Sequence, residues 1–178
     1  MAFTSPLTDF RIDVQIFDEF TNVVAEPSVL EVVAAALESE SCAPDTHVSV
    51  VIADDEVVRE LNRQHRGLDE NTDVLSFSFT HEGEYYGEQE RSALGADFDF
   101  VLPPGENDDP SLGEIIISYP QTCRQAEQAG HPVRQELTVL LVHGVLHLLG
   151  YDHEEPDDEA MMKAATSRAM GQMSPRHN

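Results

Sequence analysis

The sequence predicts one domain in which helices pack on a β-sheet, and three observations carry this prediction. The chain has 178 residues, a length that suits a single hydrophobic core. Residues 47–53 and 112–118 are rich in valine and isoleucine, which is typical of buried strands. Residues 137–149 are almost continuously apolar and predict a helix that is buried on most sides. This run is too short to span a bilayer.

The first half of the chain alternates strand signals with helix signals. Apolar and polar residues alternate over residues 13–17, which predicts a short strand. Apolar residues at helical spacing predict a packing helix over residues 27–37. Residues 47–53 predict a buried strand that ends in two aspartates, and aspartate is a favoured helix cap. The helix that follows spans about residues 55–66, and residues 74–79 are rich in strand formers.

The helix predicted over residues 55–66 carries three arginines on one face. Arg59, Arg63 and Arg66 fall at positions i, i+4 and i+7. Exposed arginine is common, so a solvated surface and a binding role are equally open for Arg59 and Arg63. Arg66 differs because it stands at the helix end beside Gly67, where a guanidinium could reach over a cleft toward phosphate. Arg66 is therefore a candidate functional residue.

Residues 80–110 differ in character from the rest of the chain, being rich in acids, glycine and proline. They predict a long acidic insertion on the surface, and a lid or partner-binding role for it stays open. Strand signal resumes at residues 112–118 and closes at Pro120, and residues 122–130 predict a helix with a glycine stop. His131-Pro132 then begins the long apolar helix.

The stretch HGVLHLLGYDH, residues 143–153, predicts a metal site. On a helix, His143 and His147 are i and i+4 and share one face. Gly150 can adopt the left-handed conformation that ends a helix, so the chain can fold back and bring His153 toward the same point. A single histidine here would most simply be a buried or surface residue without a metal. Three histidines at this spacing instead favour a shared metal ion. They leave a fourth position where zinc could hold a water.

Two residues around the histidines bear on the reaction class. Zinc proteases with the H-E-x-x-H motif carry their catalytic glutamate directly after the first histidine, where this chain has Gly144. The usual peptidase base is therefore missing. Glu136 lies seven residues before His143, near the same helix face. It could orient a ligand or pair with Arg66, or it is an acid favoured at a helix start.

The C-terminal segment and the overall composition limit the remaining possibilities. Acidic residues at 154–159 suit the start of a last helix that covers the core, and the tail at about 171–178 is expected to fray. The formal charge of -24 works against nucleic-acid binding unless positive charge is locally concentrated. Cys42 and Cys123 belong to no C-x-x-C pattern, so reduced thiols are expected. No signal peptide or membrane helix is evident, which predicts a soluble cytoplasmic protein.

Three sequence segments follow one another along the chain: LNRQHRGLDENTDVLSF, LGEIIIS and HGVLHLLGYDHE. Together they closely resemble the YbeY-like family of bacterial endoribonucleases that act in ribosomal RNA maturation, over roughly residues 45–168. The resemblance implies a single α+β domain over residues 1–178 with a mixed sheet. It also implies one Zn²⁺ per chain, held by His143, His147 and His153, with Arg66 as the functional arginine.

The resemblance further implies a zinc-dependent endoribonuclease that prefers single strands and acts in ribosomal RNA processing and ribosome maturation. Its partners would be ribosomal RNA and a ribosomal subunit or assembly proteins. Zinc would lower the pKa of a bound water and polarise a phosphoryl oxygen, while Arg66 would neutralise the phosphate. Asp152 is a candidate base, or a carboxylate that orients a ligand. A peptidase, a phosphatase and a non-enzymatic assembly factor with structural zinc remain alternatives.

Three positions depart from the family pattern. His65 stands where the family often has tyrosine, Ser78 where proline is common, and Glu114 where aspartate is usual. These changes are mild. The acidic insertion at residues 80–110 is the larger departure, and it leaves substrate access and partner choice open.

Overall fold

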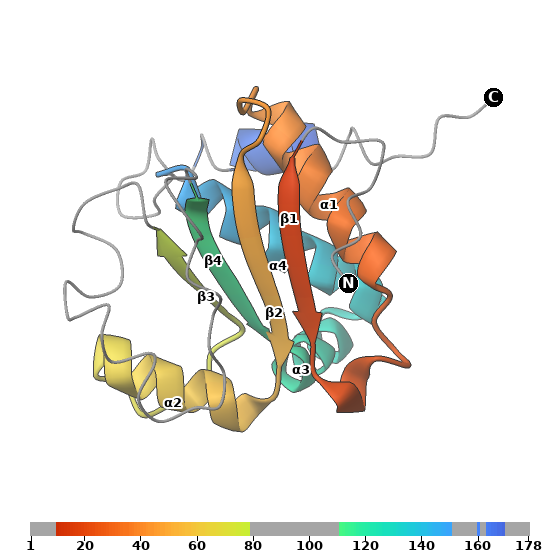
Figure 1. Cartoon of the computed structure of the whole chain (residues 1–178). Coiled ribbons are helices and arrows are strands. Elements are labelled where there is room, and N and C mark those ends of the chain that lie inside the picture. The colour runs from red at the N-terminus through yellow and green to blue at the C-terminus, as the bar shows by residue number, and fades with distance from the viewer. Residues whose placement is uncertain (1–9, 79–110, 151–159, 161–162, 170–178) are drawn as a thin grey trace.

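The computed structural model describes residues 10–78, 111–150, 160 and 163–169. Within them lies a four-stranded sheet of order β1-β2-β4-β3 (Figure 1). Strands β1 (Arg11–Ile16), β2 (His47–Ala53) and β4 (Ser111–Ser118) are parallel. Strand β3 (Val74–Ser78) pairs antiparallel with β4 at one edge. The chain is a single α+β domain with a mixed sheet and packed helices, as predicted.

Helices cover both faces of this sheet. Figure 1 shows α1 (Glu26–Ser39) and α4 (Val133–Leu148) on one side and α2 (Asp55–Arg66) at the lower edge. A short 3₁₀ helix, η1 (Asp18–Phe20), follows β1, and α3 (Tyr119–Ala129) links β4 to α4. Residues 163–169 are also helical. The described part of the chain contains no helix that is both long enough and apolar enough to cross a membrane.

The larger hydrophobic cluster lies between the sheet and the helices α1 and α4. Alternate residues of β2 and β4 point into it, because successive side chains of a strand face opposite sides. These residues are Val48, Val50, Ile52, Ile115 and Ile117. Ala165 and Ala169, both fully buried, belong to the same cluster. The last helix therefore covers the core, as predicted.

A smaller apolar cluster lies on the opposite face, under α2. It contains the alternate strand residues and the inner side of the helix: Val51, Ala53, Val58, Leu61, Leu75, Phe77 and Ile116. Leu75 and Phe77 thus share one face of β3. The sheet separates the helix that carries the candidate histidines from the helix that carries Arg66.

Most predicted elements begin and end within two residues of the expected positions, and the starts of two elements need comment. The first strand begins at Arg11 rather than residue 13. The helix predicted over residues 122–130 begins at Tyr119, because the Ser118 hydroxyl accepts a hydrogen bond from the Gln121 N–H at 3.2 Å and Pro120 suits the first turn. The insertion at 80–110, the stretch 151–159 and the tail at 171–178 lie outside the described residues. Cys42 and Cys123 are free thiols, as expected.

Candidate metal centre

Helix α4 places His143 and His147 one turn apart on the same face. Both histidines are half-buried, whereas the neighbouring apolar residues from Leu140 to Leu148 are buried. The two imidazoles therefore lie where a mostly buried helix reaches the protein surface. His153 and Asp152 lie outside the described residues, and within those residues no three side chains of ligand type come together. The predicted three-histidine set accordingly stays a prediction.

Gly144, between the two histidines, faces the sheet. A Cβ atom at this position would lie 2.8 Å from Cγ2 of Ile115 and 3.0 Å from its Cδ1. Ile115 is fully buried, so its side chain has little room to move. A longer side chain at Gly144 would project into the core rather than toward the histidine face. The position that carries a catalytic glutamate in zinc proteases is therefore unsuited to that role in this fold.

The C-terminal end of α4 packs closely on β3 and β4. At Gly113, where φ is 145°, a Cβ atom would lie 2.0 Å from the Phe77 carbonyl oxygen and 2.8 Å from Leu148 Cδ2. Only glycine allows these three elements to approach so closely. Gly150 follows with a φ of 96°, as predicted for the turn after the helix. The helix end that carries His147 is thus held against the sheet.

Arg66 is the last residue of α2, and it is exposed. Gly67 caps the helix in the left-handed conformation, with φ 69°, and its N–H donates to the Arg63 carbonyl at 3.1 Å. The chain then turns into the loop of residues 67–73 that leads to β3. The predicted location of Arg66 at a helix end is confirmed, and its role in function stays a prediction.

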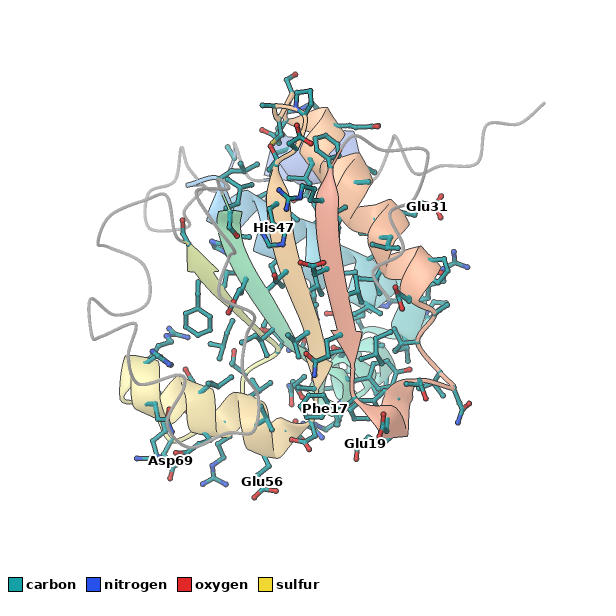
Figure 2. All side chains as sticks on the ribbon, in the orientation of Figure 1. Phe17, Glu19, Glu31, His47, Glu56 and Asp69 are labelled. Atoms are coloured by element: carbon teal, nitrogen blue, oxygen red, sulfur yellow. The ribbon has the colours of Figure 1, made fainter. Side chains whose placement is uncertain are left out.

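Arg59 and Arg63, the other two arginines of the predicted line, each pair with a carboxylate. Arg59 Nε donates to Asp69 Oδ1 at 2.8 Å, and Asp69 lies beside α2 in Figure 2. Arg63 Nε donates to Glu60 Oε2 at 3.0 Å, and the hydrogen bonds from Arg63 and Gln64 lower the pKa of Glu60 to about 2. A phosphate at either guanidinium would have to compete with a carboxylate. The structure thus favours the surface interpretation for Arg59 and Arg63.

Glu136 occupies the first turn of α4, where an acid suits the helix dipole. Its Oε2 lies 3.0 Å from Nε2 of His131, which precedes the N-cap residue of this helix. This contact agrees with the interpretation of Glu136 as a helix-start acid.

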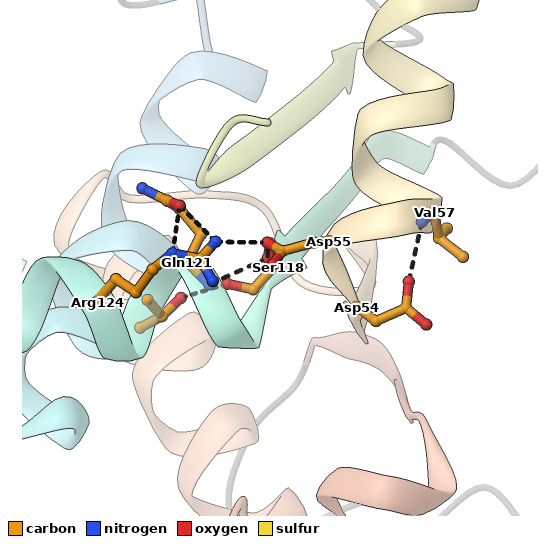
Figure 3. Close-up of polar contacts among 7 residues, drawn as sticks. Asp54, Asp55, Val57, Ser118, Gln121 and Arg124 are labelled. Atoms are coloured by element: carbon orange, nitrogen blue, oxygen red, sulfur yellow. Dashed lines mark hydrogen bonds and ion pairs between the residues drawn. The ribbon is translucent and has the colours of Figure 1, made fainter. Parts of the chain in front are cut away.

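The N-terminal end of α2 is tied to β4 and α3 through a second polar network (Figure 3). The Asp54 carboxylate accepts from the Val57 N–H at 2.9 Å and caps the helix, as predicted. Asp55 accepts from the Ser118 hydroxyl at 2.7 Å and from Arg124 at 2.8 Å. The hydrogen bond from Arg124 lowers the pKa of Asp55. This carboxylate therefore fixes where α2 begins relative to the sheet.

Two buried polar side chains near α2 received no role in the sequence analysis. Glu114, only 4% exposed, points to the α2 face, and its Oε2 has no hydrogen-bond partner. Burial raises its pKa to about 7. His65, 9% exposed, has an unpartnered Nε2, and burial lowers its pKa. Its ring meets the Phe77 ring edge-on, 5.0 Å between centroids. In the sequence, both residues stand out as departures from the family pattern, and Glu114 is also an acidic residue beside a run of isoleucines.

Comparison with known proteins identifies the family. The sequence matches the family model described as Endoribonuclease YbeY over residues 13–174. A protein named Endoribonuclease YbeY from Dehalococcoides mccartyi is 43% identical over 160 residues, covering 90% of this chain and 88% of the relative. The Roseiflexus castenholzii protein of the same name is 40% identical over 165 residues, covering 92% of each chain.

A solved structure supports the fold. The solution structure of TM1509 from Thermotoga maritima covers 95% of this chain and 99% of its own, with a TM-score of 0.51 and 23% sequence identity. At this identity the likeness concerns the fold alone. The family model and the curated relatives together lead to one conclusion: the chain belongs to the Endoribonuclease YbeY family.

Proposed function

We propose that this protein is a zinc-dependent endoribonuclease that prefers single-stranded RNA and acts in ribosomal RNA maturation. The general activity follows from the family, whose members are endoribonucleases and therefore hydrolases. The metal dependence rests on one observation: His143 and His147 share a face of α4 and are partly exposed, whereas the apolar residues beside them, from Leu140 to Leu148, are buried. Two imidazoles at positions i and i+4 of a helix lie close enough to bind one metal ion together.

The donor set fits zinc. Neutral imidazole is a common zinc ligand, and catalytic zinc sites use three protein ligands with one position left open. We assign His143, His147 and His153 as the three ligands of one zinc per chain. When bound, the ion would supply Lewis-acid polarisation of a phosphoryl oxygen and a water of lowered pKa.

Arg66 would bind the phosphate of the scissile bond. Its guanidinium offers paired donors that match phosphate oxygens, and it stands exposed at the end of α2. This contact matters more in a chain with a formal charge of -24, because the overall field repels RNA. Asp152 precedes the third histidine and would either carry a proton or orient that ligand.

The resemblance of the sequence segments supports the finer assignments. We propose ribosomal RNA as the substrate, a ribosomal subunit or assembly proteins as partners, and the cytoplasm as the compartment. The domain would span residues 1–178, with residues 80–110 as an acidic insertion.

The test measures cleavage of a single-stranded RNA together with zinc content. Purified protein should contain about one equivalent of zinc, and His143→Ala should lose both the metal and the cleavage. The matched control is His131→Ala, because His131 contacts Glu136 at the start of the same helix and is no proposed ligand. This control should keep its zinc and cleave RNA at close to the normal rate.

The alternatives give different results. A peptidase would hydrolyse an unfolded protein in a reaction abolished by His143→Ala, and that finding would overturn the nuclease assignment. An assembly factor with structural zinc would bind RNA without cleaving it under any metal. Full cleavage by zinc-free His143→Ala protein would reject the metal assignment.

A further inference from the structure

We infer that Asn62 is a positioning residue for the nuclease reaction, because it fixes the loop that follows Arg66. This inference rests on the phosphate-binding role proposed for Arg66. Asn62 lies on the inner side of α2, one turn before that arginine, and only 1% of it is exposed.

The Asn62 side chain ties α2 to the loop of residues 67–73. Its Nδ2 donates to the backbone carbonyl of Glu70 at 2.9 Å. The Arg59–Asp69 pair joins the same helix to the same loop from the outside. At its far end, the loop is held where the Asp73 carbonyl accepts from the Ser118 N–H at 2.9 Å. The loop therefore folds back along the helix, and Arg66 stands at the point where the chain reverses.

Stability alone does not account for asparagine at this position. Its neighbours on the inner side, Val58 and Leu61, are apolar members of the cluster under α2. Asn62 Oδ1 is buried without a hydrogen-bond partner, and such an atom is costly because it has lost its water. The Glu70 carbonyl belongs to an exposed residue, so water could replace the amide if the bond were lost. An apolar side chain should serve the fold at least as well.

What the amide does provide is a fixed path for the residues after the helix. A guanidinium that must meet a phosphate depends on the backbone that carries it, and small displacements of a positioned group reduce rates strongly. Helix α2 is therefore held at both ends. Asp55 anchors its first turn, and the hydrogen bond from Asn62 to the loop restricts its last turn. Asn62 thus acts through Arg66, without touching substrate.

The test compares Asn62→Leu with the wild type in three measurements: RNA cleavage, thermal unfolding and amide hydrogen exchange. We expect kcat/KM to fall about tenfold or more. The melting temperature should stay unchanged or rise, and exchange should become faster at residues 68–72. Asn62→Ala removes the same hydrogen bond without adding apolar volume, and it keeps the test valid if leucine fits poorly.

Gln64→Leu is the matched control. Gln64 also has a buried oxygen without a partner, but its Nε2 donates to Glu60 within the helix and does not reach the loop. This control should leave both cleavage and loop exchange close to the wild type. A loss of activity equal to that of Asn62→Leu would show that α2 tolerates no apolar substitution, and it would overturn the specific role of Asn62.

A double variant separates this inference from the function on which it rests. If Asn62 acts through Arg66, Asn62→Leu should add little to the defect of Arg66→Ala, and both single variants should divide their effect between kcat and KM alike. Additive defects would overturn the positioning role while leaving the function of Arg66 intact. Normal cleavage by Arg66→Ala would instead reject the proposed role of Arg66, and the inference with it.

Discussion

The two faces of the sheet are built differently. The face under α1 and α4 holds the larger apolar cluster. The face under α2 holds a smaller cluster interrupted by polar residues. Among the described residues, four buried side-chain atoms lack a hydrogen-bond partner, and all four belong to α2 or to the strand residue that faces it: Asn62 Oδ1, Gln64 Oε1, His65 Nε2 and Glu114 Oε2.

Buried polar atoms without partners reduce stability, so their concentration on one face indicates that this face serves another purpose. The α4 face supplies a rigid support for the two candidate metal ligands. The α2 face packs under the helix whose exposed end carries Arg66, the residue proposed to bind phosphate. On the proposed function, the two sides of the sheet thus carry different parts of the site, the metal ligands on the α4 side and the phosphate-binding arginine on the α2 side.

The largest expected effect comes from placing a carboxylate in the apolar face. Gly144→Glu would restore the H-E-x-x-H pattern, but its side chain would meet Ile115 in the core. Overpacking and the burial of an unpaired acid together should cost about 4 kcal/mol of unfolding free energy or more. Chemical denaturation checks this, and the variant should show no peptidase activity.

Gly144→Ala is the graded comparison. Alanine favours a helix by about 1 kcal/mol, whereas overpacking costs about 1–3 kcal/mol. The net loss should therefore be roughly 1 kcal/mol. A stable, active Gly144→Glu protein would show that this helix face is not packed as described.

The α2 face should respond to pH through Glu114. Its pKa is raised from 4.5 to about 7, so the folded state holds the proton more tightly than the unfolded state. The associated stability is present below about pH 4.5 and is lost as pH rises through 7. Relative to a variant that cannot ionise at this position, the free energy of unfolding should fall by on the order of 3 kcal/mol across this pH range. Glu114→Gln should therefore gain stability over the wild type between pH 5 and pH 8.

The neighbours of Glu114 do not cancel this effect. Ser49 on β2 and Phe77 on β3 flank it and do not titrate, whereas His65, which meets the Phe77 ring from α2, does titrate. The lowered pKa of His65 has the opposite effect on stability, because the stability that its neutral ring contributes is lost as pH falls. The wild type and Glu114→Gln both contain His65, so the difference between their melting temperatures isolates Glu114.

Glu31→Gln is the control for removal of one negative charge, because Glu31 lies on the surface of α1 (Figure 2). A difference that stays constant with pH would contradict the raised pKa.

Much of this fold could be predicted from the sequence because local signals agree with the packing. The β-branched run of β2 and the capped helix α2 have the boundaries expected from their residues. The start of α3 was missed because Ser118 ends a strand and caps a helix at once, and strand signal dominates there. Strand order could not be derived from the residues themselves, since it depends on contacts between distant segments.

The candidate site was predictable where spacing within one helix decides it. His143 and His147 needed only the helical period. The pairing of Arg59 with Asp69 could not be foreseen, because it depends on how the loop after α2 folds back. The same fold-back gives Asn62 its contact with Glu70. Residues whose role depends on a loop path stay hidden until the structure is known.

The most direct test of the division between the two faces is the zinc content and zinc affinity of Arg66→Ala, measured beside its cleavage rate. The helix of Arg66 packs on the face opposite α4, so the variant should bind one zinc per chain with wild-type affinity. Its cleavage should fall roughly a hundredfold, because the phosphate loses its cationic partner. Loss of zinc in proportion to the loss of cleavage would contradict the account, since it would mean that the two faces form one inseparable site.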